Sequence, residues 1–198
     1  MKTHNNRVDI KVVIVGNMSV GKTSLIQRFI HEKFKENMNE TIGAAFSAKE
    51  MTSMNGSKRI VGIWDTAGTE RYRSMVKMFY RDAKAAIVCF DITNKSSWEG
   101  LRSWISELRE VEEHCKVYIC GTKKDLIDEG ISEREVPLEK CNEYAKGIQV
   151  KLMETSSKTG ENVGELFQSI VDECVLDESI TGKSSLQLAE NDKRRMCC

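Results

Sequence analysis

The sequence lacks the long apolar runs and the one-sided charge that mark membrane-spanning and nucleic-acid-binding proteins. No apolar stretch approaches the ~20 residues that a helix needs to cross a bilayer. The chain has 30 Lys and Arg residues against 30 Asp and Glu residues, so its formal net charge is zero. This balance gives no reason to expect a nucleic-acid partner. Residues 1–7 make a poor signal peptide, and Lys2 excludes N-myristoylation.

Cysteine is present, but it follows no metal-binding spacing. There are seven cysteines, an odd number, and Cys89, Cys120 and Cys174 lie inside apolar patterns that are typical of small core residues. A reducing, cytoplasmic location is the simpler interpretation. Two cysteines stand apart from this pattern, because Cys197 and Cys198 are the last residues of the chain.

Short β-like runs alternate with helical segments along most of the chain. Strands are expected at residues 9–15, 44–54, 58–65, 85–91, 116–122 and 150–154. Helices are expected after residue 22, over 98–111, from Pro137 to residue 146, and over 163–174. The turn signal Asn55-Gly56 joins the second and third strands as a hairpin.

This alternation predicts an α/β fold with helices on both faces of a six-stranded sheet. The sheet should be mostly parallel, with one antiparallel hairpin strand. One domain is expected over residues 8–176. From residue 177 the apolar periodicity fades into polar residues, so 177–198 is predicted to be a flexible tail.

The segment from Gly16 to Thr23 matches the phosphate-loop pattern G-x-x-x-x-G-K-[ST]. It follows a predicted strand and opens a predicted helix, as the pattern requires, so the fold is expected to be a three-layer sandwich of the P-loop NTPase type. Lys22 should reach the β- and γ-phosphates, and the Thr23 hydroxyl should bind Mg²⁺. The alternative is a glycine-containing turn with an exposed lysine. The nucleotide-binding residues expected here are Gly16, Ser19, Val20, Gly21, Lys22, Thr23 and Ser24.

A further motif follows a predicted strand. Asp65 and Gly68 form a D-x-x-G motif at the end of the second hairpin strand, where a carboxylate can reach the metal and a glycine N–H can approach the γ-phosphate. Asp65 joins Thr23 in the predicted metal set, although a simple strand-ending turn is the alternative.

A guanine pocket is predicted from the ends of the last two strands. Asp125 should accept two hydrogen bonds from the guanine edge, a pair that adenine cannot supply. The stem of Lys123 should cover the base, and a backbone N–H near Ser157 should bind the guanine oxygen. The segments that contribute are Thr122, Lys123 and Asp125 after one strand, and Ser156, Ser157 and Lys158 after the next. Each segment occurs often by chance, so their order along the chain carries the prediction.

In this order and spacing the motifs resemble those of Ras-superfamily GTPases over residues 8–176. The resemblance implies GTP or GDP and Mg²⁺ as ligands and hydrolysis of GTP to GDP and phosphate. It makes Thr41 the switch threonine that completes the metal set, and Phe34 the aromatic residue beside the base. Lys22, Gly68 and Thr69 are the catalytic candidates that it implies.

Several segments are similar to the Rab branch, including 42–46, 64–72 and 79–83. The resemblance makes Phe46, Trp64 and Phe79 an aromatic triad read by effectors through switch segments 34–46 and 66–80, whereas ordinary core packing is the alternative. It makes Cys197 and Cys198 a geranylgeranylation signal that holds the protein on the cytosolic face of endomembranes. The other partners it implies are an exchange factor, a GTPase-activating protein, a prenyl-transfer escort and a GDI-type chaperone.

The chain departs from the usual Rab pattern in three places. Thr69 replaces the glutamine that positions the attacking water, Met18 and Ser19 fill positions where small residues are usual, and Thr122 replaces an asparagine that bridges the base and the phosphate loop. These departures are similar to those of an atypical Rab, which implies a role in degradative or autophagic membrane traffic.

The departures leave open two functions, a slowly hydrolysing switch in vesicle traffic or a GTP-loaded effector-binding module with negligible hydrolysis. A P-loop kinase is a third and weaker alternative, because the chain carries guanine motifs and no acceptor-site domain.

Overall fold

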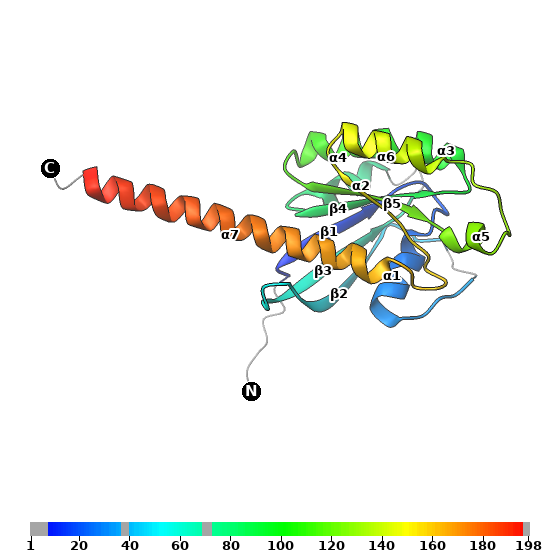
Figure 1. Ribbon diagram of the computed structural model, residues 1–198, viewed down its shortest axis with the longest axis horizontal. Coiled ribbons are helices and arrows are strands. Elements are labelled where there is room, and N and C mark those ends of the chain that lie inside the picture. Colours follow the sequence, from blue (N-terminus) through cyan, green and yellow to red (C-terminus); the bar gives the residue numbers. More distant parts are fainter. Residues whose placement is uncertain (1–7, 37–39, 69–72, 196–198) are drawn as a thin grey trace.

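A computed structural model of the chain describes residues 8–36, 40–68 and 73–195, with side chains left out at 73–75 and beyond residue 179. Its six strands form one sheet in the order β2-β3-β1-β4-β5-β6 (Figure 1). The strands are β1 (Ile10–Val15), β2 (Ala44–Thr52), β3 (Lys58–Thr66), β4 (Ala85–Asp91), β5 (Lys116–Thr122) and β6 (Lys151–Glu154). Only the β2–β3 pair is antiparallel, as the hairpin signal predicts.

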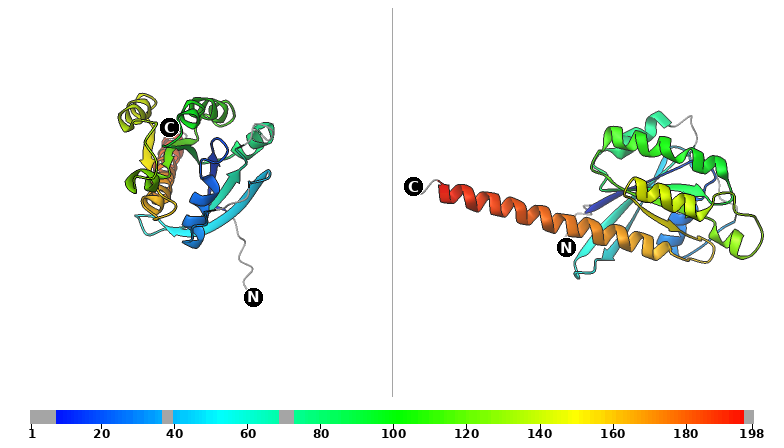
Figure 2. Two further views of the ribbon diagram at one scale, coloured as in Figure 1. Left: turned by 90° about the vertical axis from the view of Figure 1, so that its right-hand side faces the viewer. Right: turned by 45° about the horizontal axis from the view of Figure 1, so that its top comes forward.

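The helices cover both faces of this sheet, which confirms the predicted three-layer α/β fold. One core cluster packs α1 (Lys22–His31) and α7 (Val163–Arg195) on the sheet. The opposite cluster includes residues of α2 (Arg73–Tyr80), α3 (Lys95–Glu99), α4 (Leu101–Val111) and α6 (Leu138–Gly147), while α5 (Lys124–Asp128) follows β5. The end-on view in Figure 2 shows helices on both sides of the strands.

The central strands are buried on both faces, as continuous apolar runs in a parallel sheet require. All seven residues of β4 are buried, and Phe29 of α1 stacks on Phe167 of α7 with ring centroids 3.8 Å apart. Cys89, Cys120 and Cys174 are buried, in agreement with their predicted role as core residues.

The predicted helix over residues 98–111 is in fact two helices that meet at Gly100. Asn94 caps α3 by accepting a hydrogen bond from the Ser97 N–H at 3.0 Å. Gly100 lies so close to the phosphate loop that an added Cβ would stand 2.9 Å from Asn17 Oδ1. A glycine at this position is therefore required by a tertiary contact that the helical periodicity does not contain.

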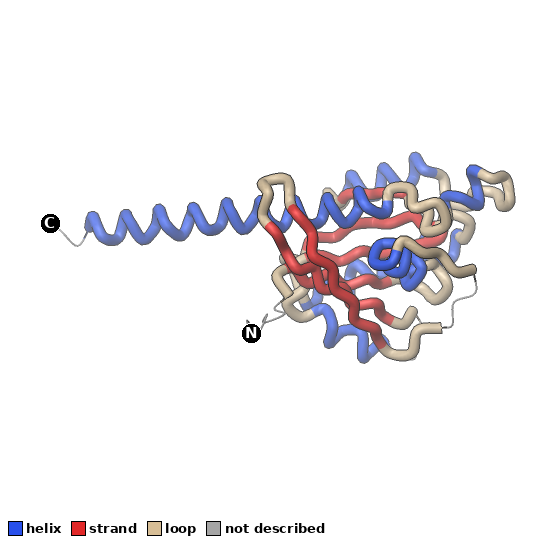
Figure 3. Tube along the Cα trace, turned by 90° about the horizontal axis from the view of Figure 1, so that it is seen from below, coloured by secondary structure: helices blue, strands red, loops and turns tan. Residues whose placement is uncertain are grey.

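The backbone of α7 is helical to Arg195, so the helix extends past residue 177, where the predicted tail begins. Together the good helix formers Leu, Gln, Ala, Glu, Lys and Arg supply 10 of the 19 residues from 177 to 195, and this stretch contains no proline. Figure 3 shows this part of α7 projecting away from the sheet. None of the helices in the described residues combines the length and the apolar character that crossing a membrane demands.

Candidate functional site

A cavity of about 490 Å³ lies at the carboxyl edge of the sheet, where the loops after β1, β3, β5 and β6 meet. Most residues of the predicted site line it: Ser19, Gly21, Lys22, Thr23, Ser24, Phe34, Thr41, Gly68, Thr122, Lys123, Asp125, Ser157 and Lys158. Gly16, Val20, Asp65 and Ser156 contact these residues from behind. Thr69, Cys197 and Cys198 lie outside the described residues.

The phosphate loop curls around the Lys22 ammonium group. Lys22 is 6% exposed, and its Nζ donates hydrogen bonds to the carbonyl oxygens of Gly16 and Asn17, both at 2.8 Å. Burial lowers the pKa of Lys22 below its ordinary value. The positive φ angles of Gly16 and Gly21 belong to the region that favours glycine, so these glycines allow the curled path.

Two side chains that sequence analysis marked as unusual stand at the cavity wall. Met18 is 49% exposed and lines the cavity. Ser19, also exposed, adopts a left-handed conformation with φ 62° that glycine would adopt without strain. The loop thus presents a thioether and a hydroxyl where many phosphate loops present little side chain.

Three oxygen-bearing side chains meet beside Lys22. The Thr23 hydroxyl donates to Asp65 Oδ2 at 2.6 Å, and its oxygen lies 2.8 Å from the Thr41 hydroxyl. Asp65 is buried, which raises its pKa, and its Oδ1 has no hydrogen-bond partner among the described residues. Hydroxyl and carboxylate oxygens are the hard ligands that Mg²⁺ prefers, so this set fits the predicted metal site.

Gly68 closes the phosphate end of the cavity against the loop. A Cβ added to Gly68 would stand 2.5 Å from the backbone carbonyl group of Asn17 and would also collide with the Lys22 ammonium group. Such contacts are too short for any side chain. The glycine is therefore required for the close approach that sequence analysis assigns to the D-x-x-G motif.

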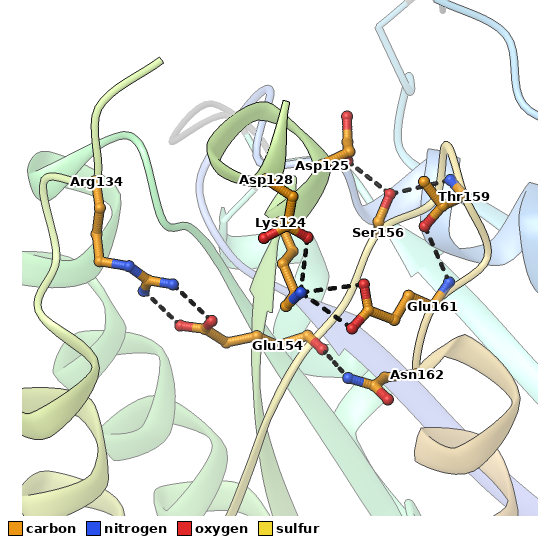
Figure 4. Close-up of polar contacts among 9 residues, drawn as sticks. All are labelled: Lys124, Asp125, Asp128, Arg134, Glu154, Ser156, Thr159, Glu161 and Asn162. Carbon is orange, nitrogen blue, oxygen red and sulfur yellow. Dashed lines mark hydrogen bonds and ion pairs between the residues drawn. The ribbon is translucent and has the colours of Figure 1, made fainter. Parts of the chain in front are cut away.

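At the other end of the cavity, Asp125 has one oxygen fixed and one free for a ligand. Ser156 Oγ donates to Asp125 Oδ1 at 2.7 Å and accepts the Thr159 N–H at 3.0 Å (Figure 4). Asp125 is buried, and among the described residues no hydrogen bond reaches its Oδ2. This arrangement orients the carboxylate toward the cavity, as the recognition of a guanine edge needs.

Lys123 is held by an acid that sequence analysis did not single out. Lys123 has a left-handed backbone with φ 64°, and its Nζ lies 2.6 Å from Oδ2 of the buried Asp91. Asp91 also accepts hydrogen bonds from the Thr93 N–H and hydroxyl. Phe34 lines the same cavity and is partly buried.

Thr122, which replaces an asparagine that bridges the base and the phosphate loop, still bonds the loop. Its hydroxyl lies 2.6 Å from the Val20 carbonyl oxygen and 2.9 Å from that of Phe90, so two acceptors share one proton. The tie between β5 and the phosphate loop is therefore retained. A threonine side chain bonded in this way has no donor left for the base.

Arg28 and Trp104 are two further site residues that no motif predicted. Arg28 Nε donates to the Ser157 carbonyl oxygen at 2.6 Å, and Trp104 Nε1 donates to Asn17 Oδ1 at 2.8 Å. Both side chains come from helices that pack beside the cavity. Each bonds a loop residue far away in sequence, so only the folded chain shows its role.

The predicted aromatic triad is partly core and partly surface. Phe46 is 55% exposed and packs on Trp64 with ring centroids 4.8 Å apart. Trp64 and Phe79 are partly buried against the core cluster that contains α2 and α4. Core packing therefore accounts for Trp64 and Phe79 in part, while Phe46 presents an exposed aromatic surface.

A profile of the Ras family matches residues 11–188 of the chain. The chain belongs to the Ras family. It is 44% identical to the Ras-related protein Rab-24 of Dictyostelium discoideum over 84% of this chain and 81% of that protein. It is 41% identical to the human Ras-related protein Rab-31 over 82% and 81%, and 39% identical to the GTP-binding protein ypt5 of Schizosaccharomyces pombe over 87% and 81%. This Rab-type GTPase therefore shares the family's general ability to bind GTP, GDP and Mg²⁺ and to hydrolyse GTP.

Proposed function

We propose that this Rab-type GTPase is a slow switch of membrane traffic that binds GTP or GDP with Mg²⁺ in the described cavity. The observation that carries the proposal is the convergence of two side-chain sets in one cavity. Asp125 and Lys123 suit a guanine base, while Thr23, Thr41 and Asp65 suit the metal beside the phosphates.

The proposed roles of the phosphate-side residues follow from their positions. Lys22 stands where it can exchange its two carbonyl partners for phosphate oxygens, and Gly68 lies in the wall beside it. Bound Mg²⁺ would neutralise charge on the phosphates. The hydroxyls of Thr23 and Thr41 and the Asp65 carboxylate would hold and orient that ion.

The proposed slow hydrolysis of GTP rests on Met18 and Thr69. A threonine at position 69 is too short to hold both the attacking water and the transition-state oxygens. Met18 projects at the cavity wall, where it would crowd a catalytic arginine supplied by an activating protein. The exposed Met18 side chain also favours a second candidate function, a GTP-loaded module that binds effectors with negligible hydrolysis.

The membrane part of the proposal depends on the end of the chain. Two lipid chains, one each on Cys197 and Cys198, would anchor the protein stably, whereas one short chain gives only marginal attachment. Effectors would read the segments 34–46 and 66–80, and an exchange factor, an activating protein, a prenyl-transfer escort and a GDI-type chaperone would control nucleotide state and membrane residence. Autophagic or degradative traffic is the step that we propose.

Two measurements test the switch itself. The protein purified from cells should carry GDP or GTP, and chromatography of the released nucleotide identifies it. Single-turnover hydrolysis should be slow in the wild type and faster by severalfold in Thr69→Gln, whereas Met18→Ser should improve stimulated hydrolysis more than intrinsic hydrolysis. A wild-type rate equal to that of a glutamine-bearing Rab would contradict slow hydrolysis, and an undetectable rate would favour the GTP-loaded module.

Membrane attachment is tested separately. Replacing both Cys197 and Cys198 by serine should move the protein from the membrane fraction to the cytosol while GDP binding stays unchanged. Membrane association that survives this double replacement would contradict the lipid anchor and leave the nucleotide site untouched.

A further inference from the structure

The side chain of Arg28, on the last turn of α1, donates to three backbone carbonyl groups. Arg28 Nε lies 2.6 Å from the Ser157 carbonyl oxygen, and Nη1 lies 2.8 Å from that of Glu32. Nη2 bonds the carbonyl oxygen of Lys158. The guanidinium group is planar and carries its donors in a fixed fork, so these bonds fix its acceptors relative to each other.

The three carbonyl groups belong to two segments that wall the base end of the cavity. Ser157 and Lys158 lie in the loop after β6 and line the cavity themselves. Glu32 ends α1 with a left-handed φ of 56°, two residues before Phe34, which also lines the cavity. One guanidinium group therefore joins the loop behind the base to the segment that leads to Phe34.

The stem of Arg28 is also packed against this loop. A Cβ added to Gly160 would stand 3.7 Å from Arg28 Cδ, which is ordinary van der Waals distance. Arg28 is half-buried and is not among the residues that line the cavity, so it touches the loop but not the ligand space.

We propose that Arg28 is a positioning residue for guanine recognition. By holding the Ser157 and Lys158 carbonyl groups, it sets the place of the Ser157 backbone against the base, and by holding Glu32 it sets the approach of Phe34. This inference rests on the proposed binding of guanine nucleotides. It adds a determinant of base affinity and base choice that acts from outside the cavity.

Arg134 offers a matched control for the loss of a forked arginine. Its two terminal nitrogens bond the two oxygens of Glu154 at 2.6 and 2.8 Å (Figure 4). Neither residue lines the cavity. Arg134→Gln should therefore lower thermal stability through the lost ion pair without altering the walls of the base site.

The test compares Arg28→Gln, Arg28→Lys and Arg134→Gln with the wild type. Arg28→Gln should release GDP and GTP roughly tenfold faster, to the same extent for both, because the base is common to both nucleotides. The ratio of GDP affinity to ADP affinity should fall by a similar factor. Arg28→Lys keeps a positively charged donor group on a single nitrogen, so its release rate should increase less. Arg134→Gln should release both nucleotides at the wild-type rate.

Two results would overturn the inference: unchanged release from Arg28→Gln, or an equal loss of GDP and ADP affinity, which is the signature of a general packing defect. If Arg28→Gln does not fold, Arg28→Lys decides the matter by the same two readouts. A wild type that binds no guanine nucleotide would overturn the proposed function as well. Normal wild-type binding with unchanged release from the Arg28 variants would overturn only the positioning role.

Discussion

The base end and the phosphate end of the cavity hold their side chains in different ways. At the base end, Asp125 and Lys123 are bonded to partners behind them, Ser156 and Asp91, so Asp125 keeps Oδ2 and Lys123 keeps its aliphatic stem for a ligand. At the phosphate end, the groups that would bind metal and phosphate are bonded to one another or to the loop, as Thr23 is to Asp65.

This difference separates recognition from switching. A base site that is fixed from behind needs no rearrangement to bind, so its geometry determines which base is accepted. A metal site whose ligands bond each other must exchange those bonds when it fills, and a ligand shifts a conformation only through such differential interactions. The phosphate end is therefore where GTP and GDP should differ in effect.

The largest expected effect comes from breaking the base end. Asp125→Asn should lower GDP affinity on the order of a hundredfold, because two charge-assisted acceptor bonds are lost, and it should raise affinity for xanthosine diphosphate. Competition binding with the two diphosphates measures both changes. Asp128→Asn is the control, because Asp128 lies on the same short helix and its carboxylate bonds Lys124 alone among the described residues, at 2.7 Å. A mutant that still prefers GDP would show that the pocket is misassigned.

An intermediate effect is expected at the phosphate end. Thr41→Val keeps the shape of the side chain but removes the hydroxyl that lies 2.8 Å from Thr23 Oγ1. The Mg²⁺ concentration needed to retain GTP should rise roughly tenfold, while retention of GDP should hardly change. Titration of nucleotide release against Mg²⁺ gives both values. An equal change for the two nucleotides would mean that Thr41 supports the structure of the site and does not distinguish the GTP-bound from the GDP-bound state.

The smallest effect should come from Thr122, which joins the two ends. Thr122→Asn supplies a longer side chain that can reach the base as well as the Val20 carbonyl group, so GDP release should slow two- to tenfold, about the effect of one neutral hydrogen bond. Stopped-flow release of GDP measures the change. An unchanged rate would mean that residue 122 slows GDP release only through its bond to the Val20 carbonyl group, which threonine already makes.

The sequence predicted the elements whose signals are local. β4 and β5 have the predicted bounds because their apolar runs end at Asp91 and Thr122, and α6 begins directly after Pro137. The short helices α2 and α5 were not predicted, since eight and five residues hold too few turns to show a period. The division at Gly100 was missed because the apolar spacing from Trp98 to Val111 continues across it.

The same rule separates the predicted site residues from the missed ones. Lys22, Thr23, Asp65 and Asp125 belong to motifs that end strands, so spacing alone indicates them. Arg28 and Trp104 act across 129 and 87 positions of the chain, a separation that no local pattern records. Asp91 ends a predicted strand but matches no motif, so its pairing with Lys123 appears only when β4 and β5 lie side by side.

The hydrogen bond from Trp104 Nε1 to Asn17 Oδ1 places a natural chromophore on the phosphate loop. Trp104 is buried, and the carbonyl group of Asn17 accepts the Lys22 ammonium group, so a single residue separates the indole from the charge that meets the phosphates. The indole N–H proton is thus an internal NMR reporter of the loop, and its chemical shift registers a movement of Asn17 without any attached label. Trp64 and Trp98, which lie under Lys11 and beside Phe90, supply reference signals from the same chain.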